Sequence, residues 1–145
     1  MTEYSFSISL TPRYRDIDPN GHVNHAVYAT YFEEARSAYW DAVVDEPLAE
    51  AGVALVSQQI EYEHELRLGD EVTVLMRVDE LGDSSIPMSY ELRRAGRSVA
   101  TGSVVMVTFD RTERRSRRLP ERWRSAIRNH EAAHDTPWAA DNASS

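Results

Sequence analysis

The sequence predicts an α+β domain in which an antiparallel sheet of five strands curls around one long central helix. Apolar side chains recur at helical spacing over residues 24–44, which at about 1.5 Å per residue gives a helix roughly 30 Å long. Between residues 53 and 109, four segments alternate apolar and polar side chains and are joined by short turn signals, as in consecutive antiparallel strands. No other long helix is expected in the first two-thirds of the chain, so the sheet should bury the apolar face of this one.

The first strand is expected at residues 6–10, where apolar and polar side chains alternate, and Arg13-Tyr14-Arg15 extends the pattern. Pro12 places this strand at a sheet edge or a bulge, because proline cannot donate a ladder hydrogen bond. The helix follows, and Asp45-Glu46-Pro47 ends it. Its apolar face consists of Tyr28, Tyr31, Phe32, Ala35, Tyr39, Ala42 and Val43, with Glu33, Glu34, Arg36, Ser37 and Asp41 off that face.

The remaining strands should follow a short helical turn at residues 48–52. The longest is expected at residues 53–68, with His64 on its apolar face as a core or interface histidine. The other strands and the turn signals between them are residues 71–81, 86–94 and 97–109, with Gly69-Asp70, residues 82–85 and Ala95-Gly96.

A basic connector at residues 111–118 should lead into a short helix that begins at Leu119-Pro120-Glu121, with Trp123 and Ile127 facing inward. We expect a single domain over residues 1–134, a length that can bury a sizeable core. Residues 135–145 are rich in Ala, Ser, Asp and Asn and should form a disordered tail.

The composition excludes several classes of function. The chain has 145 residues, a net charge of -8 and 16 basic residues that are all arginine. An acidic chain disfavours nonspecific binding to nucleic acid. Without lysine there is no Schiff base or P-loop lysine, and without cysteine there is no disulfide, thiolate metal site or cysteine nucleophile. The sequence has no apolar run long enough to span a membrane and no signal-peptide pattern, so we expect a cytoplasmic protein.

Residues 16–25 place two carboxylates and two imidazoles in a short polar loop directly before the helix. Pro19-Asn20-Gly21 is a turn signal, and Gly21 allows both a left-handed turn and the close approach of a substrate to the backbone. Free N–H groups at a helix start can stabilise an oxyanion, and a nearby carboxylate can activate water or attack a carbonyl. This combination suits hydrolysis of a thioester, because a thiolate leaves with little help from a general acid.

A structural interpretation of the same loop is also open. Asp16 and Asp18 are two residues apart and share one face of an extended chain, so they can cap or buttress the helix start as Asx-turn residues. In this interpretation, the side chains of His22 and His25 serve only to make hydrogen bonds within the loop. The residues alone therefore leave the chemical and the structural interpretation open.

The loop and the helix after it carry a family resemblance. Residues 14–25 read Y-R-D-I-D-P-N-G-H-V-N-H, and Tyr28 and residues 31–36, Y-F-E-E-A-R, follow them. This run resembles the D-x-D-x-x-G-H-V-N-[NH]-x-x-Y motif and E-x-A-R helix of the 4-hydroxybenzoyl-CoA thioesterase-like family of hot-dog-fold acyl-CoA thioesterases. Residues 68–72, L-G-D-E-V, are similar to that family's usual turn between two strands. The resemblance covers about residues 5–130 and implies the hot-dog fold.

The resemblance also implies roles for individual residues. Asp18 occupies the position of the family's catalytic carboxylate, a general base or a nucleophile, and the backbone N–H of His25 that of an oxyanion donor. Asp16 would support the loop without taking part in the chemistry. The residues expected to bind the substrate or the oxyanion are Gly21, His22, Asn24 and His25. We therefore expect an acyl-CoA thioesterase that needs no cofactor beyond the coenzyme A of its substrate.

The fold that the resemblance implies forms at least dimers with active sites at the interface, so we expect a homodimer or a homotetramer. Two other functions stay open: a non-catalytic acyl-thioester-binding or assembly protein, and a dehydratase of the same fold, which needs a histidine and an acid as its acid–base pair. The two-acid loop with Asp18 favours hydrolysis over dehydration.

Eight of the 16 arginines fall within residues 111–128. Arg111, Arg114 and Arg115 are candidates for binding the phosphates of coenzyme A, because guanidinium groups make charge-assisted hydrogen bonds to phosphate. The alternative is a solvated helix face. The acidic partners of the arginines would then be Glu113, Glu121 and Glu131.

His130-Glu131-Ala132-Ala133-His134 matches the H-E-x-x-H pattern of zinc proteases. A catalytic zinc needs a third protein ligand held by a scaffold, and only 11 residues follow this stretch. We therefore expect no metal centre, while incidental metal binding by the stretch stays open.

Overall fold

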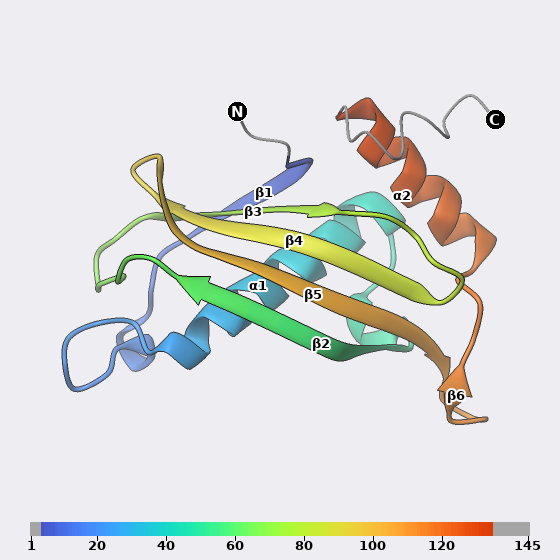
Figure 1. Cartoon of the computed structure of the whole chain (residues 1–145), viewed down its shortest axis with the longest axis horizontal. Coiled ribbons are helices and arrows are strands. Elements are labelled where there is room, and N and C mark those ends of the chain that lie inside the picture. Colours follow the sequence, from blue (N-terminus) through green and yellow to red (C-terminus); the bar gives the residue numbers. More distant parts are fainter. Residues whose placement is uncertain (1–3, 135–145) are drawn as a thin grey trace.

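The computed structural model describes residues 4–134 and shows a curled antiparallel sheet wrapped around one long helix (Figure 1). The strands are β1 (Phe6–Leu10), β2 (Val53–Tyr62), β3 (Val72–Val78), β4 (Ser85–Arg94), β5 (Arg97–Asp110) and β6 (Arg115–Ser116). The helices are α1 (His25–Tyr39) and α2 (Glu121–Ala133), with the short turns η1 (Tyr14–Asp16), η2 (Trp40–Val44) and η3 (Leu48–Glu50). Five strands run in the order β1-β3-β4-β5-β2, and the short β6 adds to β5. The predicted sheet and helix are confirmed.

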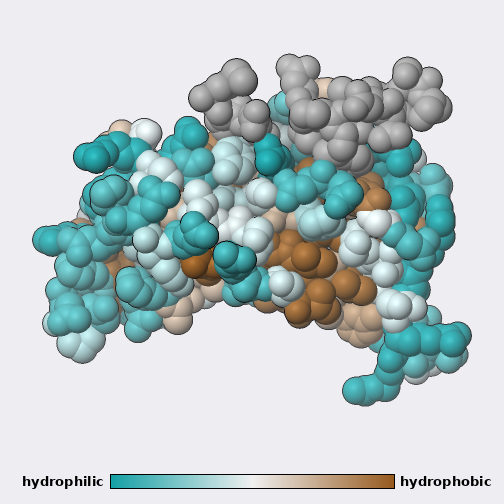
Figure 2. Space-filling view, viewed as in Figure 1, coloured by the Kyte–Doolittle hydropathy of each residue, from teal (hydrophilic) through white to brown (hydrophobic). Residues whose placement is uncertain are grey.

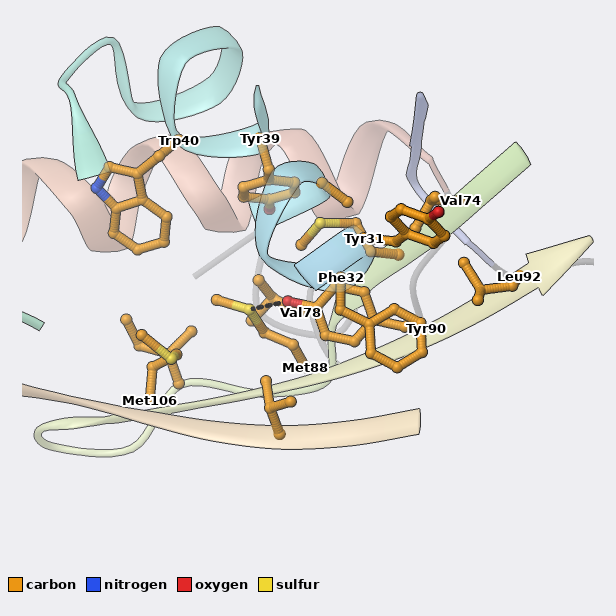
Figure 3. Packing of buried hydrophobic residues seen from close by; sticks show 14 of the residues in the cluster. Tyr31, Phe32, Tyr39, Trp40, Val74, Val78, Met88, Tyr90, Leu92 and Met106 are labelled. Carbon is orange, nitrogen blue, oxygen red and sulfur yellow. Dashed lines mark hydrogen bonds between the residues drawn. The ribbon is translucent and has the colours of Figure 1, made fainter. Parts of the chain in front are cut away.

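The strands keep the alternation that the sequence predicts. In β3, Val72, Val74, Met76 and Val78 are buried, while the residues between them are partly exposed. The neighbouring β4 repeats this pattern in antiparallel register with β3. The buried faces of the strands and of α1 form one core cluster, part of which Figure 3 shows.

Helix α1 packs very closely against this sheet. Phe32 of α1 stacks on Tyr90 of β4 with ring centroids 4.7 Å apart (Figure 3). Gly102 of β5 allows this approach, because a Cβ atom at that position would lie 2.5 Å from Phe32 Cε2. The depth at which α1 sits in the sheet therefore depends on a residue without a side chain.

The C-terminal helix α2 is fastened to the end of α1 by aromatic rings and a buried carboxylate. Trp123 of α2 meets Trp40 edge-on, with ring centroids 5.4 Å apart. Oε2 of the fully buried Glu131 accepts hydrogen bonds from the hydroxyls of Ser5 and Tyr39, each at 2.7 Å. The inward orientation predicted for Trp123 is confirmed, as is that of Ile127. The alternative in which Glu131 is a solvated partner of the arginines is therefore wrong.

The strand predicted at residues 53–68 ends at Tyr62. The N–H groups of Glu63 and His64 both donate to the carbonyl of Val99, so the one-to-one ladder with β5 stops there. Leu66 is buried in the segment that follows, whereas His64 is exposed in this chain and is not a core residue.

The first strand also ends earlier than predicted. Arg13-Tyr14-Arg15 does not extend β1, since Tyr14 and the two residues after it form η1 and the Tyr14 side chain is 84% exposed. The physical cause is Asp16, whose carboxylate accepts a hydrogen bond from the N–H of Arg13 at 2.8 Å and closes the turn.

Residues 135–145, predicted to form a disordered tail, lie outside the described residues. The domain boundary at residue 134 stays a prediction. Among residues 4–134, no helix combines the length and the apolar character needed to cross a membrane.

Candidate functional site

The polar loop before α1 is a compact turn closed by its own backbone. Ile17 and Val23 pair as an isolated antiparallel bridge, and between them the N–H of Asp18 donates to the carbonyl of His22 at 2.8 Å. Gly21 has a φ of 83°, a conformation that residues with a side chain rarely adopt, and its N–H donates to the carbonyl of Asp18 at 3.0 Å. Residues 19–21, predicted as a turn, therefore form the tip of the loop directly after Asp18.

Asp18 is half-buried and is held by one of its two carboxylate oxygens. Its Oδ1 accepts hydrogen bonds from the N–H groups of Asn20 at 2.9 Å and His22 at 3.2 Å. Its Oδ2 accepts no hydrogen bond from residues 4–134. The Asx-turn role is thus filled by one oxygen, and the other oxygen is available for chemistry.

The carboxylate of Asp16, the other acid of the loop, is engaged in structural hydrogen bonds. Its Oδ2 accepts hydrogen bonds from the hydroxyl of Tyr31 and from the N–H of Arg13, both at 2.8 Å. Its carbonyl accepts from the N–H of Asn24 at 2.9 Å. Burial, and then the hydrogen bond to Asp16, raise the pKa of Tyr31, so the phenol stays protonated as a donor. Asp16 therefore ties the loop to α1.

The start of α1 leaves a backbone donor free. Asn24, expected to line the site, caps the helix, with its Oδ1 accepting from the N–H of Ala26 at 2.9 Å. The N–H of His25, the first residue of α1, donates no hydrogen bond within the described part of the chain. The His25 ring stacks on Tyr62 at 4.5 Å, and the Tyr62 hydroxyl donates to the His25 carbonyl at 3.1 Å. The helix start is thereby fixed against the end of β2.

His22 is paired with an acid of the segment that follows β2. Its Nε2 lies 3.0 Å from Oε2 of Glu65. A hydrogen bond from Arg67 lowers the pKa of the exposed Glu65, and His22 acts in the same direction. The N–H of Val23 adds a backbone bond of 2.7 Å to the carbonyl of Leu66. The loop is therefore anchored on two sides, to α1 and to this segment.

The three candidate phosphate-binding arginines line a pocket of about 660 Å³ at the other end of β2. Arg111, Arg114 and Arg115 are exposed there. The other residues of the pocket are Ser116 and the apolar Ala54, Val56, Val107 and Phe109. Figure 2 shows apolar surface on this face of the sheet, beside a hydrophilic corner at β6. Within one chain β6, whose residues line this pocket, and the loop before α1 lie at opposite ends of the molecule (Figure 1), so one chain does not bring the pocket and Asp18 together.

Arg36 was placed off the apolar face of the helix in the sequence, and this is wrong. It is 4% exposed and lines a second pocket, of about 570 Å³, between α1 and the start of β2. Tyr28, Phe32 and Arg36 are spaced four residues apart, so the helical spacing itself puts Arg36 on the buried face. Because arginine is charged, a pattern of apolar residues does not include Arg36, and its position on the buried face is missed.

The H-E-x-x-H stretch serves packing in this structure. The carboxylate of Glu131 points into the core, while His130 Nε2 lies 3.0 Å from the carbonyl of Ser5. Nδ1 of His134 lies 2.8 Å from the carbonyl of His130. Within residues 4–134 no group of three or more His, Cys, Asp or Glu side chains is placed to hold a metal ion.

Comparisons with known proteins agree with this architecture. A family model described as the thioesterase-like superfamily matches residues 12–127. A thioesterase from Thermus thermophilus, solved in complex with coenzyme A and Zn, is 35% identical, with a TM-score of 0.83 over 91% of this chain and 98% of that chain. A predicted thioesterase from Bacillus stearothermophilus is 25% identical, with a TM-score of 0.80 over 86% and 95%. The uncharacterized protein YsmA of Bacillus subtilis (strain 168) is 28% identical over 108 residues, 73% of this chain and 74% of its own. The expected hot-dog fold is confirmed.

Proposed function

Because the chain belongs to the thioesterase-like superfamily, we propose that it hydrolyses an acyl-CoA thioester to a free acid and coenzyme A. The observation that carries the proposal is the carboxylate of Asp18. Within the described residues, one of its oxygens is fixed by two backbone donors and the other accepts no hydrogen bond. The loop leads directly into a helix start at which the N–H of His25 is likewise unused among those residues. A carboxylate and an oxyanion donor are sufficient for a thioester, because its thiolate leaves readily.

Asp18 can act in two ways in this reaction. As a general base, it accepts a proton from a water molecule while that water adds to the thioester carbonyl. As a nucleophile, its Oδ2 attacks the carbonyl, expels the thiolate and forms an anhydride that water then hydrolyses. In both routes the N–H of His25 holds the oxyanion of the tetrahedral intermediate. Neither route requires a cofactor beyond the coenzyme A of the substrate.

The active form would contain two chains paired along β2. This strand is at the edge of the sheet and, among the described strands, pairs only with β5. Leu55 and Val56 on it are 43% and 59% exposed. An edge strand with exposed apolar side chains is a template for pairing with another chain. Antiparallel pairing of β2 with its copy would give a homodimer, alone or within a homotetramer.

This pairing would also complete the substrate site. It places the Tyr62 end of one β2, where the Asp18 loop packs, beside the Val53 end of the other. The arginine pocket lies at that second end, so the partner's arginines would bind the phosphates of coenzyme A. Arg114→Gln should then raise KM for an acyl-CoA several-fold and leave KM unchanged for the matching acyl-pantetheine, which has no phosphates.

One contact favours a second candidate function. The pair of His22 and Glu65, 3.0 Å apart, provides the histidine and acid that a dehydratase needs. Incubation with a 3-hydroxyacyl-CoA separates the two functions, because a hydratase–dehydratase changes the ultraviolet absorbance of the enoyl thioester without releasing thiol.

Thiol release from a panel of short, long and aromatic acyl-CoAs tests the proposed hydrolysis. We expect at least one thioester to be cleaved well above the buffer blank, at a rate proportional to protein concentration. Sedimentation on the same sample should give a dimer or tetramer. If no thioester is cleaved but acyl-CoA binds, the chain is a non-catalytic binding protein and the proposal is wrong.

A further inference from the structure

Arg36 is a buried cation with an incomplete set of partners. Its side chain is 5% exposed, and its Nε has no hydrogen-bond partner within the described residues. Nη1 lies 3.4 Å from the Tyr90 hydroxyl, which is a long contact. Nη2 lies 4.0 Å from a carboxylate oxygen of Glu33, whose side chain is 69% exposed. A buried guanidinium is costly unless it is paired, so this arrangement suits an anion that comes from outside the chain.

The pocket that Arg36 lines has the composition of a site for a chain with a charged end. Leu48, Val53, Leu55 and Met106 supply an apolar wall. Its polar residues are Glu33, Glu34, Arg36, Ser37 and Arg111. An apolar wall fits methylene groups, and a planar guanidinium fits a carboxylate with two parallel hydrogen bonds. Glu33, the acid nearest to Arg36, is largely in solvent and competes only weakly for it.

We propose that this pocket binds the acyl group of the substrate and that Arg36 binds a carboxylate at the far end of that group. The preferred substrates would then be acyl-CoAs that carry a terminal carboxylate. This inference rests on the proposed hydrolysis and names the class of substrate. It makes Arg36 a specificity-determining residue rather than part of the chemistry.

The pocket of one chain would serve the Asp18 of the other. It opens at Val53 and Leu55, whereas the Asp18 loop packs at Tyr62. His25, whose N–H is the proposed oxyanion donor, and Arg36 are eleven residues apart on the same helix, or roughly 16 Å at about 1.5 Å per residue. An acyl group of a few carbons cannot span that distance within one chain. Antiparallel pairing of two β2 strands brings the Asp18 loop of one chain to the pocket of its partner.

Matched pairs of thioesters test the substrate class. Glutaryl-CoA and pentanoyl-CoA have the same number of carbons and differ in a terminal carboxylate against a methyl group. We expect kcat/KM to be about tenfold or more in favour of glutaryl-CoA, the size of a charge-assisted hydrogen bond. The same comparison is made for each dicarboxylic acyl-CoA from malonyl-CoA to adipoyl-CoA and the neutral acyl-CoA with the same number of carbons. Each rate is corrected for spontaneous hydrolysis, and the series shows which acyl length the pocket prefers. Equal or higher kcat/KM for the neutral member of every pair would overturn the proposal.

Two variants assign the preference to Arg36. Arg36→Gln should lower kcat/KM for glutaryl-CoA about tenfold more than for pentanoyl-CoA. Glu33→Gln removes the competing acid from an exposed position and should increase the preference for glutaryl-CoA, which keeps the test valid if Arg36→Gln does not fold. Asp41→Asn, an exposed acid elsewhere on the same helical segment, should leave the preference unchanged. An equal loss on both substrates in Arg36→Gln, with no change in Glu33→Gln, would contradict the proposal.

Mixed dimers test whether the pocket and Asp18 come from different chains. Coexpression of Asp18→Asn with Arg36→Gln gives mixed dimers in which one of the two sites has both residues intact. Hydrolysis of glutaryl-CoA should then recover to roughly a quarter of the wild-type rate, since about half of the dimers are mixed. No recovery would mean that the two residues do not share a site across the interface.

Binding of a thioether that cannot be hydrolysed separates failure of this inference from failure of the proposed function. S-carboxybutyl-coenzyme A should bind more tightly than S-pentyl-coenzyme A even if no thioester is cleaved. Tighter binding without turnover would leave the carboxylate site in place and refute the hydrolase. Turnover with no preference in rate or binding would refute the carboxylate site alone.

Discussion

Tyr31 donates a hydrogen bond of 2.8 Å to the carboxylate of Asp16, and this bond distinguishes the two acids of the loop. The same oxygen of Asp16 also accepts from the backbone N–H of Arg13. Asp18 has no such side-chain donor among the described residues and keeps Oδ2 free. Asp16 is therefore engaged in structure, whereas Asp18 keeps one carboxylate oxygen without a hydrogen bond in the described part of the chain.

Removing the Tyr31 hydroxyl should destabilise the fold without abolishing activity. Tyr31→Phe leaves a partly buried carboxylate with one donor fewer, which costs about 1–2 kcal/mol of unfolding free energy. Urea unfolding measures this loss. Tyr14→Phe is the matched control, because the Tyr14 side chain is 84% exposed and should tolerate the change. Equal stability of Tyr31→Phe and Tyr14→Phe would contradict the structural role of Asp16.

The buried carboxylate of Glu131 should contribute strongly to stability. Ser5 and Tyr39 each donate to it at 2.7 Å, and the N–H of Val78 donates at 3.3 Å. Glu131→Ala leaves these donors unpaired in the core and should cost about 3 kcal/mol or more.

Thermal unfolding checks this value against a control on the exposed side of the same helix. Asn129→Ala removes an exposed polar side chain of α2 and should change stability by no more than about 0.5 kcal/mol. If the two α2 variants unfold at the same temperature, the Glu131 cluster does not fasten the helix.

His130 should make the fold less stable in mild acid. Burial lowers the pKa of His130 below its ordinary value near 6.5, and His134 acts in the same direction against the opposing charge of Glu131. The unfolded chain therefore binds the proton more tightly than the folded chain. Stability is then full above about pH 6.5 and falls as the pH drops through the window between the two pKa values.

His130→Gln removes this titration and keeps a donor for the carbonyl of Ser5. Urea unfolding at about pH 7 and pH 5 should therefore show a smaller loss of stability on acidification in the variant than in the parent. The same loss in both proteins would mean that another group causes the acid sensitivity.

The fold could be predicted from the sequence because its signals are local. The alternation of β3 and β4 and the helical spacing of α1 follow from which face each element buries. The residue at which a strand ends depends instead on the neighbouring strand with which it pairs. The alternating pattern continues past Tyr62 to Leu68, yet the N–H groups of Glu63 and His64 both donate to the carbonyl of Val99, and the one-to-one ladder with β5 stops there.

The candidate site could be predicted only in part. The turn at Gly21 and the helix start at His25 have local signatures, so the loop was found. The spacing of Tyr28, Phe32 and Arg36 places Arg36 on the buried face of α1, although its charge favours solvent. Only the packing of distant segments reveals the burial of Glu131. The Asp18 loop packs at Tyr62 and the two pockets lie toward the Val53 end of β2, and the local patterns of the sequence do not encode how far apart such segments lie.

The kcat of Asp18→Asn for the best acyl-CoA of the panel decides whether Asp18 takes part in the chemistry. The substitution keeps the size of the side chain and its backbone hydrogen bonds but removes the base or nucleophile. We expect kcat to fall about a thousandfold, with KM and unfolding temperature close to those of the parent, while Asp41→Asn stays at the parental rate. A kcat within about threefold of the parent would mean that Asp18 is neither the base nor the nucleophile.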